Sequence, residues 1–248
     1  FGDTYRIGYD LSIDGLSLAF LLLSSILFTF ASFGSWEIKK EQKGYFSLFL
    51  LLEIGTLGLF CADNFALFFL FYEVTFVTMF FLVGKWGNKN KKKAAFQFLI
   101  YNGLASVLLL ISLGGLFAQT GTVHFKEWEF LLSEKETVLQ GGGKKLLFLC
   151  LLVAFGIKLP VFPFQQWMVQ VHKEAHPTVI MIHSGILLKV GAYGLIRIVM
   201  EFFPEEWEKW GPAIMVLGAV NLLFGALMAL IQKELVSVWA YSTVSHMG

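Results

Sequence analysis

Residues 145–197 read KLLFLCLLVAFGIKLPVFPFQQWMVQVHKEAHPTVIMIHSGILLKVGAYGLIR, and the expected fold is built outward from them. Each of their two long apolar runs carries one lysine, Lys158 or Lys189. A lysine at bilayer depth costs about 2.5–3.5 kcal/mol to insert, so it is seldom there without a partner or a use. Pro160 and Pro163 follow Lys158 and must break its helix, because proline lacks the backbone donor. A broken helix at membrane depth has to face protein or a wet cavity. The stretch therefore predicts an ion path.

The composition is that of a membrane protein. Of the 248 residues, 56% are hydrophobic and 15% charged, and the mean hydropathy is +0.69, which indicates several membrane spans. A net charge of +1 gives no nucleic-acid footprint. Cys61 and Cys150 lie in apolar runs, so we interpret them as small buried hydrophobes and expect neither a disulfide nor a metal site. Because the chain begins without Met and stops inside an apolar run, we expect a fragment of a longer polytopic protein.

Apolar run lengths predict an all-α, polytopic transmembrane fold. The half-span 146–158 makes only about 20 Å of helix, so residues 161–171 must complete that crossing beyond the break. Asp14 is expected to cap the first helix, and 125–132 to form a short surface helix. The expected spans are 16–34, 45–61, 65–84, 94–118, the broken 146–171, 178–200 and 212–231, with 235–248 beginning another.

The lysines of the loops predict the orientation. Loops 36–43 and 85–93 are lysine-rich and are expected on the cytoplasmic side. The short acidic turn 62–64 and an acidic loop at 201–209 then fall outside.

Ionisable residues inside the spans are the candidate site. Glu73, Lys158 and Lys189 lie deepest, and Glu53 is a further candidate one helix earlier. The structural alternative is that the carboxylates only neutralise the lysines, but buried pairs stabilise weakly. Proton transfer suits these groups better, since burial disfavours a charged lysine and a nearby carboxylate restores it. We predict that Glu73, Lys158 and Lys189 form a proton relay.

Histidines extend this set as possible relay members. His183 lies six residues before Lys189, about 600° of helical rotation, so we expect no direct contact between the two. His172 belongs to a polar cluster after the break (His172, Lys173, Glu174, His176). Its H-x-E-x-H spacing is not that of a helical zinc motif. Two interpretations of the cluster therefore stay open, a proton-uptake gate and a plain interfacial loop. His246 is a weaker candidate in the last helix.

Three separated segments resemble, in this order, the antiporter-like subunits of respiratory complex I. They are FALFFLFYEVTFVTMFFLVGKWG (65–87), FGIKLPVFPFQQWMVQVHKEAHPTVIMIHSGILLKVGAYGLIR (155–197) and LVSVWAYSTVSHMG (235–248). The resemblance covers nearly the whole chain and is strongest to the chain M (chain 4) branch of bacterial NADH:quinone oxidoreductase. The Mrp-type antiporter subunits share the same core.

The resemblance implies a fourteen-helix fold with two inverted five-helix repeats, each holding one broken helix. Residues 1–248 would be one truncated antiporter-like domain, with 45–200 the first repeat and 212–248 the start of the second. Glu73, Lys158 and Lys189 match the family's buried proton-carrying groups. The family pattern after the break is close to FPFHTWLPDAHVEAP, so a role for a histidine at position 165 does not carry over to Gln165.

The implied function is proton translocation by a membrane-arm subunit of NADH:quinone oxidoreductase, multi-pass in the inner (cytoplasmic) membrane. Its partners would be the other membrane-arm subunits, including neighbouring antiporter-like ones. No cofactor is expected in this chain; NADH, FMN, iron–sulfur clusters and quinone would be bound by partner subunits. The alternatives are a subunit of an Mrp-type cation/proton antiporter or a membrane-bound hydrogenase, and a scaffold whose buried charges only pack.

Overall fold

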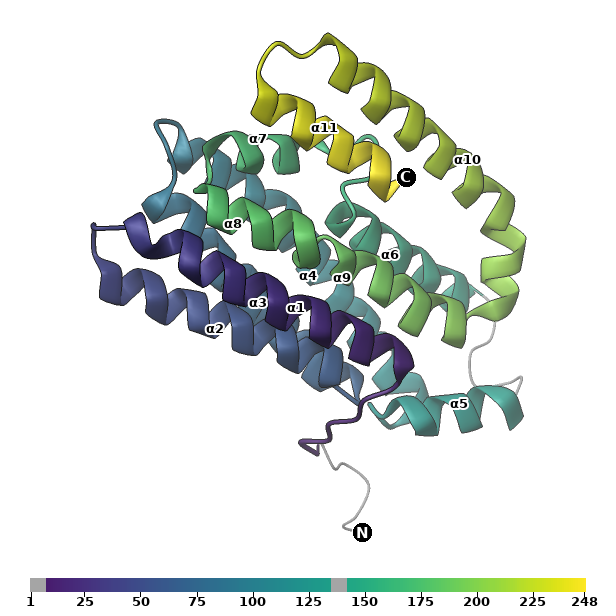
Figure 1. The fold of residues 1–248 in the computed structure, drawn as a ribbon. Coiled ribbons are helices and arrows are strands. Elements are labelled where there is room, and N and C mark those ends of the chain that lie inside the picture. Colours follow the sequence, from purple (N-terminus) through teal and green to yellow (C-terminus); the bar gives the residue numbers. More distant parts are fainter. Residues whose placement is uncertain (1–7, 135–141) are drawn as a thin grey trace.

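A computed structural model describes residues 8–134 and 142–248, which form a bundle of helices (Figure 1). Six of the helices in these ranges are long and apolar enough to cross a membrane. The expected all-α, multi-pass fold is therefore confirmed. In chain order the elements are α1 (Gly15–Gly34), η1 (Ser35–Glu37), α2 (Gln42–Cys61), α3 (Phe65–Trp86), α4 (Lys91–Thr120), α5 (Phe125–Glu134), α6 (Gly142–Lys158), α7 (Gln166–Glu174), α8 (Pro177–Ile182), η2 (His183–Leu187), α9 (Lys189–Gly194), η3 (Leu195–Met200), α10 (Pro204–Ile231) and α11 (Leu235–Met247).

Neighbouring helices pack in sequence order and enclose an aromatic core. α2 packs on α3, α3 on α4, and α4 on both halves of the broken helix, α6 and α7. α1 lies across α2 and α8, while α10 and α11 form a pair at one edge (Figure 1). The ring of Phe60 stacks on Phe20 at 5.0 Å and meets Tyr193 edge-on at 5.1 Å. Such van der Waals packing holds helices together in lipid, because the hydrophobic effect does not favour helix association in an apolar solvent.

Asp14 caps α1 as the sequence predicts. Its carboxylate accepts a hydrogen bond from the Ser17 backbone N–H at 2.7 Å and one from Arg197 Nη1, also at 2.7 Å. The cap satisfies a donor that the first helical turn leaves free. It also joins the start of α1 to the end of η3.

The helix containing Lys158 breaks where the prolines require it. α6 ends at Lys158 and α7 resumes at Gln166. Two side chains from elsewhere satisfy backbone groups that the break frees: Trp167 Nε1 donates to the Ile157 carbonyl at 3.1 Å, and the Phe162 N–H donates to Asn221 Oδ1 at 2.9 Å. Asn221, on α10, also donates to the Val244 carbonyl on α11 at 2.9 Å. The break is therefore tied to the α10–α11 pair.

Replacing Asn221 by leucine is expected to destabilise the protein by about 1–3 kcal/mol. The substitution preserves volume but removes the acceptor of the Phe162 N–H and the Asn221 donor to the Val244 carbonyl, which keeps only a 3.3 Å bond from the Gly248 N–H. Unfolding of the detergent-solubilised full-length protein measures the change. Gln232→Leu at the end of the same helix is the control, since its amide donates only to the nearby Met228 carbonyl. Equal stability of both variants would contradict the bridging role.

The start of α10 differs from the prediction. An acidic loop was expected at 201–209 and a span from Pro212, but α10 begins at Pro204 and Pro212 lies inside it. Pro204 is pre-organised for a first helical position. Glu205 and Glu206 occupy the first turn, where the helix dipole favours carboxylates. The acidic residues that indicated a loop thus belong to the N-terminal turn of a helix.

The remaining predicted elements appear close to their expected positions. α5 is the predicted short helix, and α11 is the helix expected at 235–248. The span predicted at 178–200 is a helix interrupted by two π-type segments, η2 and η3. Single π turns inside α-helices occur frequently at functional sites.

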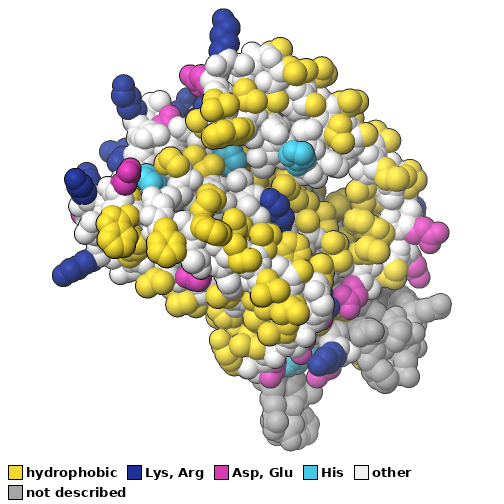
Figure 2. All heavy atoms as spheres, viewed as in Figure 1, with side chains coloured by type: hydrophobic (Ala, Val, Ile, Leu, Met, Phe, Trp, Pro, Cys, Tyr) yellow, Lys and Arg dark blue, Asp and Glu magenta, His cyan; other side chains and the backbone are white. Residues whose placement is uncertain are grey.

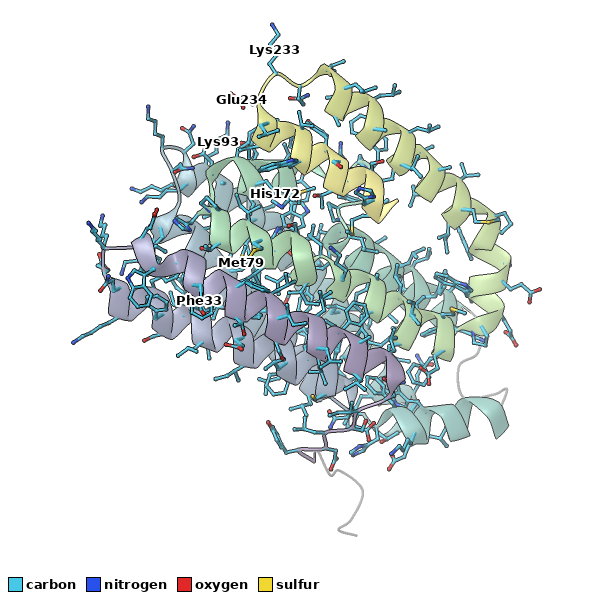
Figure 3. The ribbon with its side chains drawn as sticks, in the orientation of Figure 1. Phe33, Met79, Lys93, His172, Lys233 and Glu234 are labelled. Atoms are coloured by element: carbon cyan, nitrogen blue, oxygen red, sulfur yellow. The ribbon has the colours of Figure 1, made fainter. Side chains whose placement is uncertain are left out.

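Basic side chains gather at one end of the bundle. The loops that join α1 to α2, α3 to α4 and α10 to α11 all lie there, at the upper left and top of Figure 1. In Figure 2 several lysine side chains project from this end. Lys93 and Lys233, labelled in Figure 3, mark it. The lysine-rich loops therefore share one end, as the charge pattern predicts.

Candidate proton-relay site

Lys158 is buried at the end of α6, with 2% of its surface exposed. Its ammonium donates to Asn102 Oδ1 on α4 at 3.4 Å and lies 4.8 Å from the centroid of the Tyr72 ring on α3. An aromatic face attracts a cation and is worth more when the pair is desolvated. Two uncharged groups therefore hold a buried lysine.

Glu73 lies half-buried on α3, one residue after Tyr72. It accepts a hydrogen bond from the Ser106 hydroxyl on α4 and interacts electrostatically with Lys158. Within the described part of the chain, no direct salt bridge joins these two groups. Asn102 and Ser106 are four residues apart and so share one face of α4. That face places an amide on Lys158 and a hydroxyl on Glu73, so each charged group contacts a neutral group of the same helix.

A histidine pair extends the site beyond Lys158. His172 Nε2 and His183 Nδ1 are 3.3 Å apart, and this contact joins α7 to η2. Both rings are buried, and Trp167 packs edge-on against His183 at 5.5 Å. His183 interacts electrostatically with Lys158 and Lys189, and its Nε2 has no hydrogen-bond partner among the residues described. His183 is thus near enough to both lysines to interact with their charges.

Lys189 begins α9, directly after the π segment. Its ammonium donates to the Ser184 carbonyl, next to His183 in sequence. The expectation of no direct His183–Lys189 contact agrees with the hydrogen bonds, although η2 replaces the α-helical geometry on which it rested. Lys189 is only half-buried, unlike Lys158.

A pocket of about 360 Å³ opens beside His172, between α8 and α11. Ser184, Ser242 and Thr243 contribute hydroxyls to its lining, and Trp239 an aromatic ring. Figure 3 labels His172 in this region, between α8 and α11. Hydroxyl-lined space next to a buried histidine suits water, which can carry a proton.

Other candidates lie outside this cluster. Glu53, on α2, and His246, exposed on α11, make no hydrogen bond or ion pair with the site in the described ranges. The polar cluster after the break also separates: Glu174 accepts from the Asn90 backbone at 2.8 Å, while His176 bonds Thr178 Oγ1 at 2.7 Å. Only His172 of that cluster joins the relay candidates. No group of three His, Cys, Asp or Glu able to hold a metal occurs in the residues described.

Sequence reasoning missed Tyr72, Asn102 and Ser106. Their positions in the sequence offer a signal: Tyr72 precedes Glu73, and Asn102 and Ser106 are polar residues four apart in a mainly apolar span. The His172–His183 pair had no such signal, because it depends on how α7 folds back on η2.

A family model described as "NADH:quinone oxidoreductase/Mrp antiporter, TM" matches residues 62–248. The chain belongs to this family. The match contains Glu73, Lys158, Lys189 and the histidine pair. It also contains the two polar residues of α4 that contact Glu73 and Lys158.

Similar proteins agree with the family. "NAD(P)H-quinone oxidoreductase chain 4, chloroplastic" from Mesostigma viride is 36% identical over 240 residues, covering 97% of this chain and 46% of that protein. "NAD(P)H-quinone oxidoreductase chain 4 1" from Synechococcus sp. (strain JA-3-3Ab) is 37% identical over 245 residues, covering 98% and 46%. The chain thus spans about half the length of the curated relatives it matches.

Solved structures show the same fold. A chain of "Respiratory complex I from Thermus thermophilus with bound NADH" superposes with a TM-score of 0.82 at 26% identity, covering 96% of this chain and 49% of that one. A chain of the archaeal "membrane-bound sulfane sulfur reductase (MBS)" gives a TM-score of 0.85 at 23% identity, covering 96% and 39%. The second likeness concerns the fold alone.

Proposed function

We propose that this chain is part of a proton-translocating membrane-arm subunit of NADH:quinone oxidoreductase. The observation that carries the proposal is the set of ionisable groups around the helix break: Glu73 interacts electrostatically with Lys158, His172 contacts His183, and His183 interacts electrostatically with Lys158 and Lys189. A structural set of charges would be paired directly, whereas Glu73 and Lys158 contact neutral hydroxyl, amide and aromatic groups. That spacing suits proton transfer. The names of the relatives favour this reading over an Mrp-type antiporter or a hydrogenase.

The residues have distinct roles in this proposal. Lys158 holds a proton in a dry site, and the charge on Glu73 stabilises it. The Asn102–Ser106 face of α4 sets the distance between the two. His183 and His172 accept and release protons between the lysines, since imidazole does so near neutral pH. Lys189 passes the proton on. Glu53 and His246 stay possible members reached through water.

The rest of the complex supplies the driving reaction. We propose that partner subunits bind NADH, FMN, iron–sulfur clusters and quinone, and that neighbouring antiporter-like subunits flank this one. We place the protein in an inner (cytoplasmic) membrane, with its lysine-rich end on the cytoplasmic side. Residues 45–200 would form the first five-helix repeat and 212–248 begin the second.

Glu73→Gln is the direct test of the relay and is expected to lower proton pumping at least about tenfold. The amide keeps the shape and can still accept from Ser106, but it removes the charge that stabilises the Lys158 ammonium. Glu73→Asp keeps the charge on a shorter arm and should retain part of the activity. Proton uptake into vesicles containing the assembled full-length complex measures both. Glu37→Gln, at an exposed position on η1, is the control. Wild-type pumping by an assembled Glu73→Gln complex would reject the relay and make the carboxylate structural.

A further inference from the structure

An apolar groove with two lysines at its mouth lies where α3 ends and α4 begins. It has a volume of about 350 Å³, within the usual range of ligand pockets. Phe81 and Phe96 form its walls and are 47% and 60% exposed. Lys85 and Lys92 line the same groove. Nothing in the proton relay uses this surface, which lies on different faces of α3 and α4.

Each of the two helices, α3 and α4, contributes one phenylalanine and one lysine to the groove, and the order along the chain is reversed between them. Phe81 precedes Lys85 by four residues on α3, and Phe96 follows Lys92 by four on α4. Residues four apart share a helix face and differ in height by about 6 Å. Because α3 runs toward the lysine-rich end and α4 away from it, each lysine lies at that end and each phenylalanine one turn deeper. The groove is therefore cationic at its mouth and aromatic below.

Small residues form the floor of the groove. A Cβ added to Gly84 would lie 3.3 Å from the Ala95 Cβ, so the helices approach closely at this point. Small residues at a helix crossing permit such approach. The space between the two phenylalanines is thus set by the close approach of the α3 and α4 backbones.

The charges around the mouth are unbalanced. Lys85 is held by an ion pair with Glu41 and lies 4.9 Å from the Trp86 ring. Lys92 makes no hydrogen bond or ion pair with any residue that the structure describes. The adjoining loop and the start of α4 add Lys89, Lys91 and Lys93, whereas the acidic neighbour Glu174 is engaged by Asn90. An anion at the mouth would offset this excess.

We propose that the groove binds an anionic phospholipid. Its phosphate lies between Lys85 and Lys92, and an acyl chain lies against Phe81 and Phe96. Basic pockets between membrane helices on the cytoplasmic side suit anionic head groups. A free phosphate would leave the apolar walls uncovered, and a zwitterionic lipid has no net charge to offset the excess of lysines around the mouth. The inference does not depend on the proton relay.

Photolabelling in nanodiscs tests the site. The assembled full-length complex is reconstituted with phosphatidylglycerol or phosphatidylcholine carrying a photoactivatable acyl chain, and label on residues 80–96 is quantified by mass spectrometry. The test variants are Lys92→Gln alone and Lys85→Gln with Lys92→Gln. Lys89→Gln with Lys93→Gln is the matched control, because it removes the same charge from the same region without touching the groove lining.

The expected result is phosphatidylglycerol label in wild type that falls about fivefold for each groove lysine removed. Label in the Lys89/Lys93 control should stay near the wild-type level, and phosphatidylcholine should label weakly throughout. Equal losses in the test and control variants would mean attraction to the charged end in general and would overturn the site. Absence of label in every protein would do the same, and would mean that another subunit covers the groove.

Discussion

Lys158→Ala is expected to abolish proton pumping, by at least about 100-fold, while the complex still assembles. Within the part of the chain that the structure describes, Lys158 is the only cation at the helix break, and its ammonium contacts two neutral groups, Asn102 and the Tyr72 ring. In the described part of the chain no direct salt bridge to Lys158 is broken by its removal, and Glu73 keeps the hydrogen bond from the Ser106 hydroxyl. Folding should therefore suffer less than when one half of a buried ion pair is lost. Proton uptake into vesicles by the assembled variant measures the effect.

Two further variants make the Lys158 result specific. Lys158→Met fills the space with an uncharged side chain of similar length and should fail to pump as alanine does, which excludes a cavity as the cause. Lys145→Ala, at the exposed start of the same helix, should pump normally. Normal pumping by assembled Lys158→Ala would reject the relay.

The sequence was most informative where one residue type leaves one physical outcome. The break after Lys158 was predictable because Pro160 and Pro163 cannot continue a helix. The depth of Glu73 followed from counting residues along an apolar span. Asp14 was predictable as a cap from its position before the first span, and the structure places its carboxylate on the Ser17 N–H.

The failures occurred where local composition fits two structures. Acidic residues at 201–209 suit a loop and a helix N-terminus equally, and only the placement of Pro204 and Glu205 in a first turn distinguishes them. The His172–His183 contact joins residues from two helix segments, so helical periodicity within either could not indicate it. The π segment after Ile182 likewise has no sequence signature in its apolar surroundings.

The two neutral residues at the centre of the site, Asn102 and Ser106, were missed because they carry no charge. Asn102 and Ser106 are two of several polar residues along α4, so neither stands out in the sequence. Their four-residue spacing acquires meaning once α4 is known to lie against both α3 and α6. Searches for relay sites that consider ionisable residues alone would overlook the groups that keep them apart.

Lys189→Arg is expected to stop pumping although it preserves the charge. Arginine holds its proton at every accessible pH, so it cannot release one to the next group, whereas lysine shifts readily when buried. Lys189 lies about 16 Å along its span, near the midplane, so it needs a further acceptor to release its proton. We propose that this acceptor lies outside these 248 residues, in the longer subunit that the relatives represent.

A static role for Lys189 predicts the opposite result. A cation that only neutralises a buried carboxylate could be replaced by arginine without loss. In the described part of the chain the Lys189 ammonium bonds a backbone carbonyl, that of Ser184, and no carboxylate pairs with it. Lys144, which forms a 2.7 Å ion pair with Glu205, is the matched static cation, and Lys144→Arg should pump normally. Lys189→Ala should fail as arginine does. Near-normal pumping by assembled Lys189→Arg complexes would reject the relay and assign the lysine a structural charge.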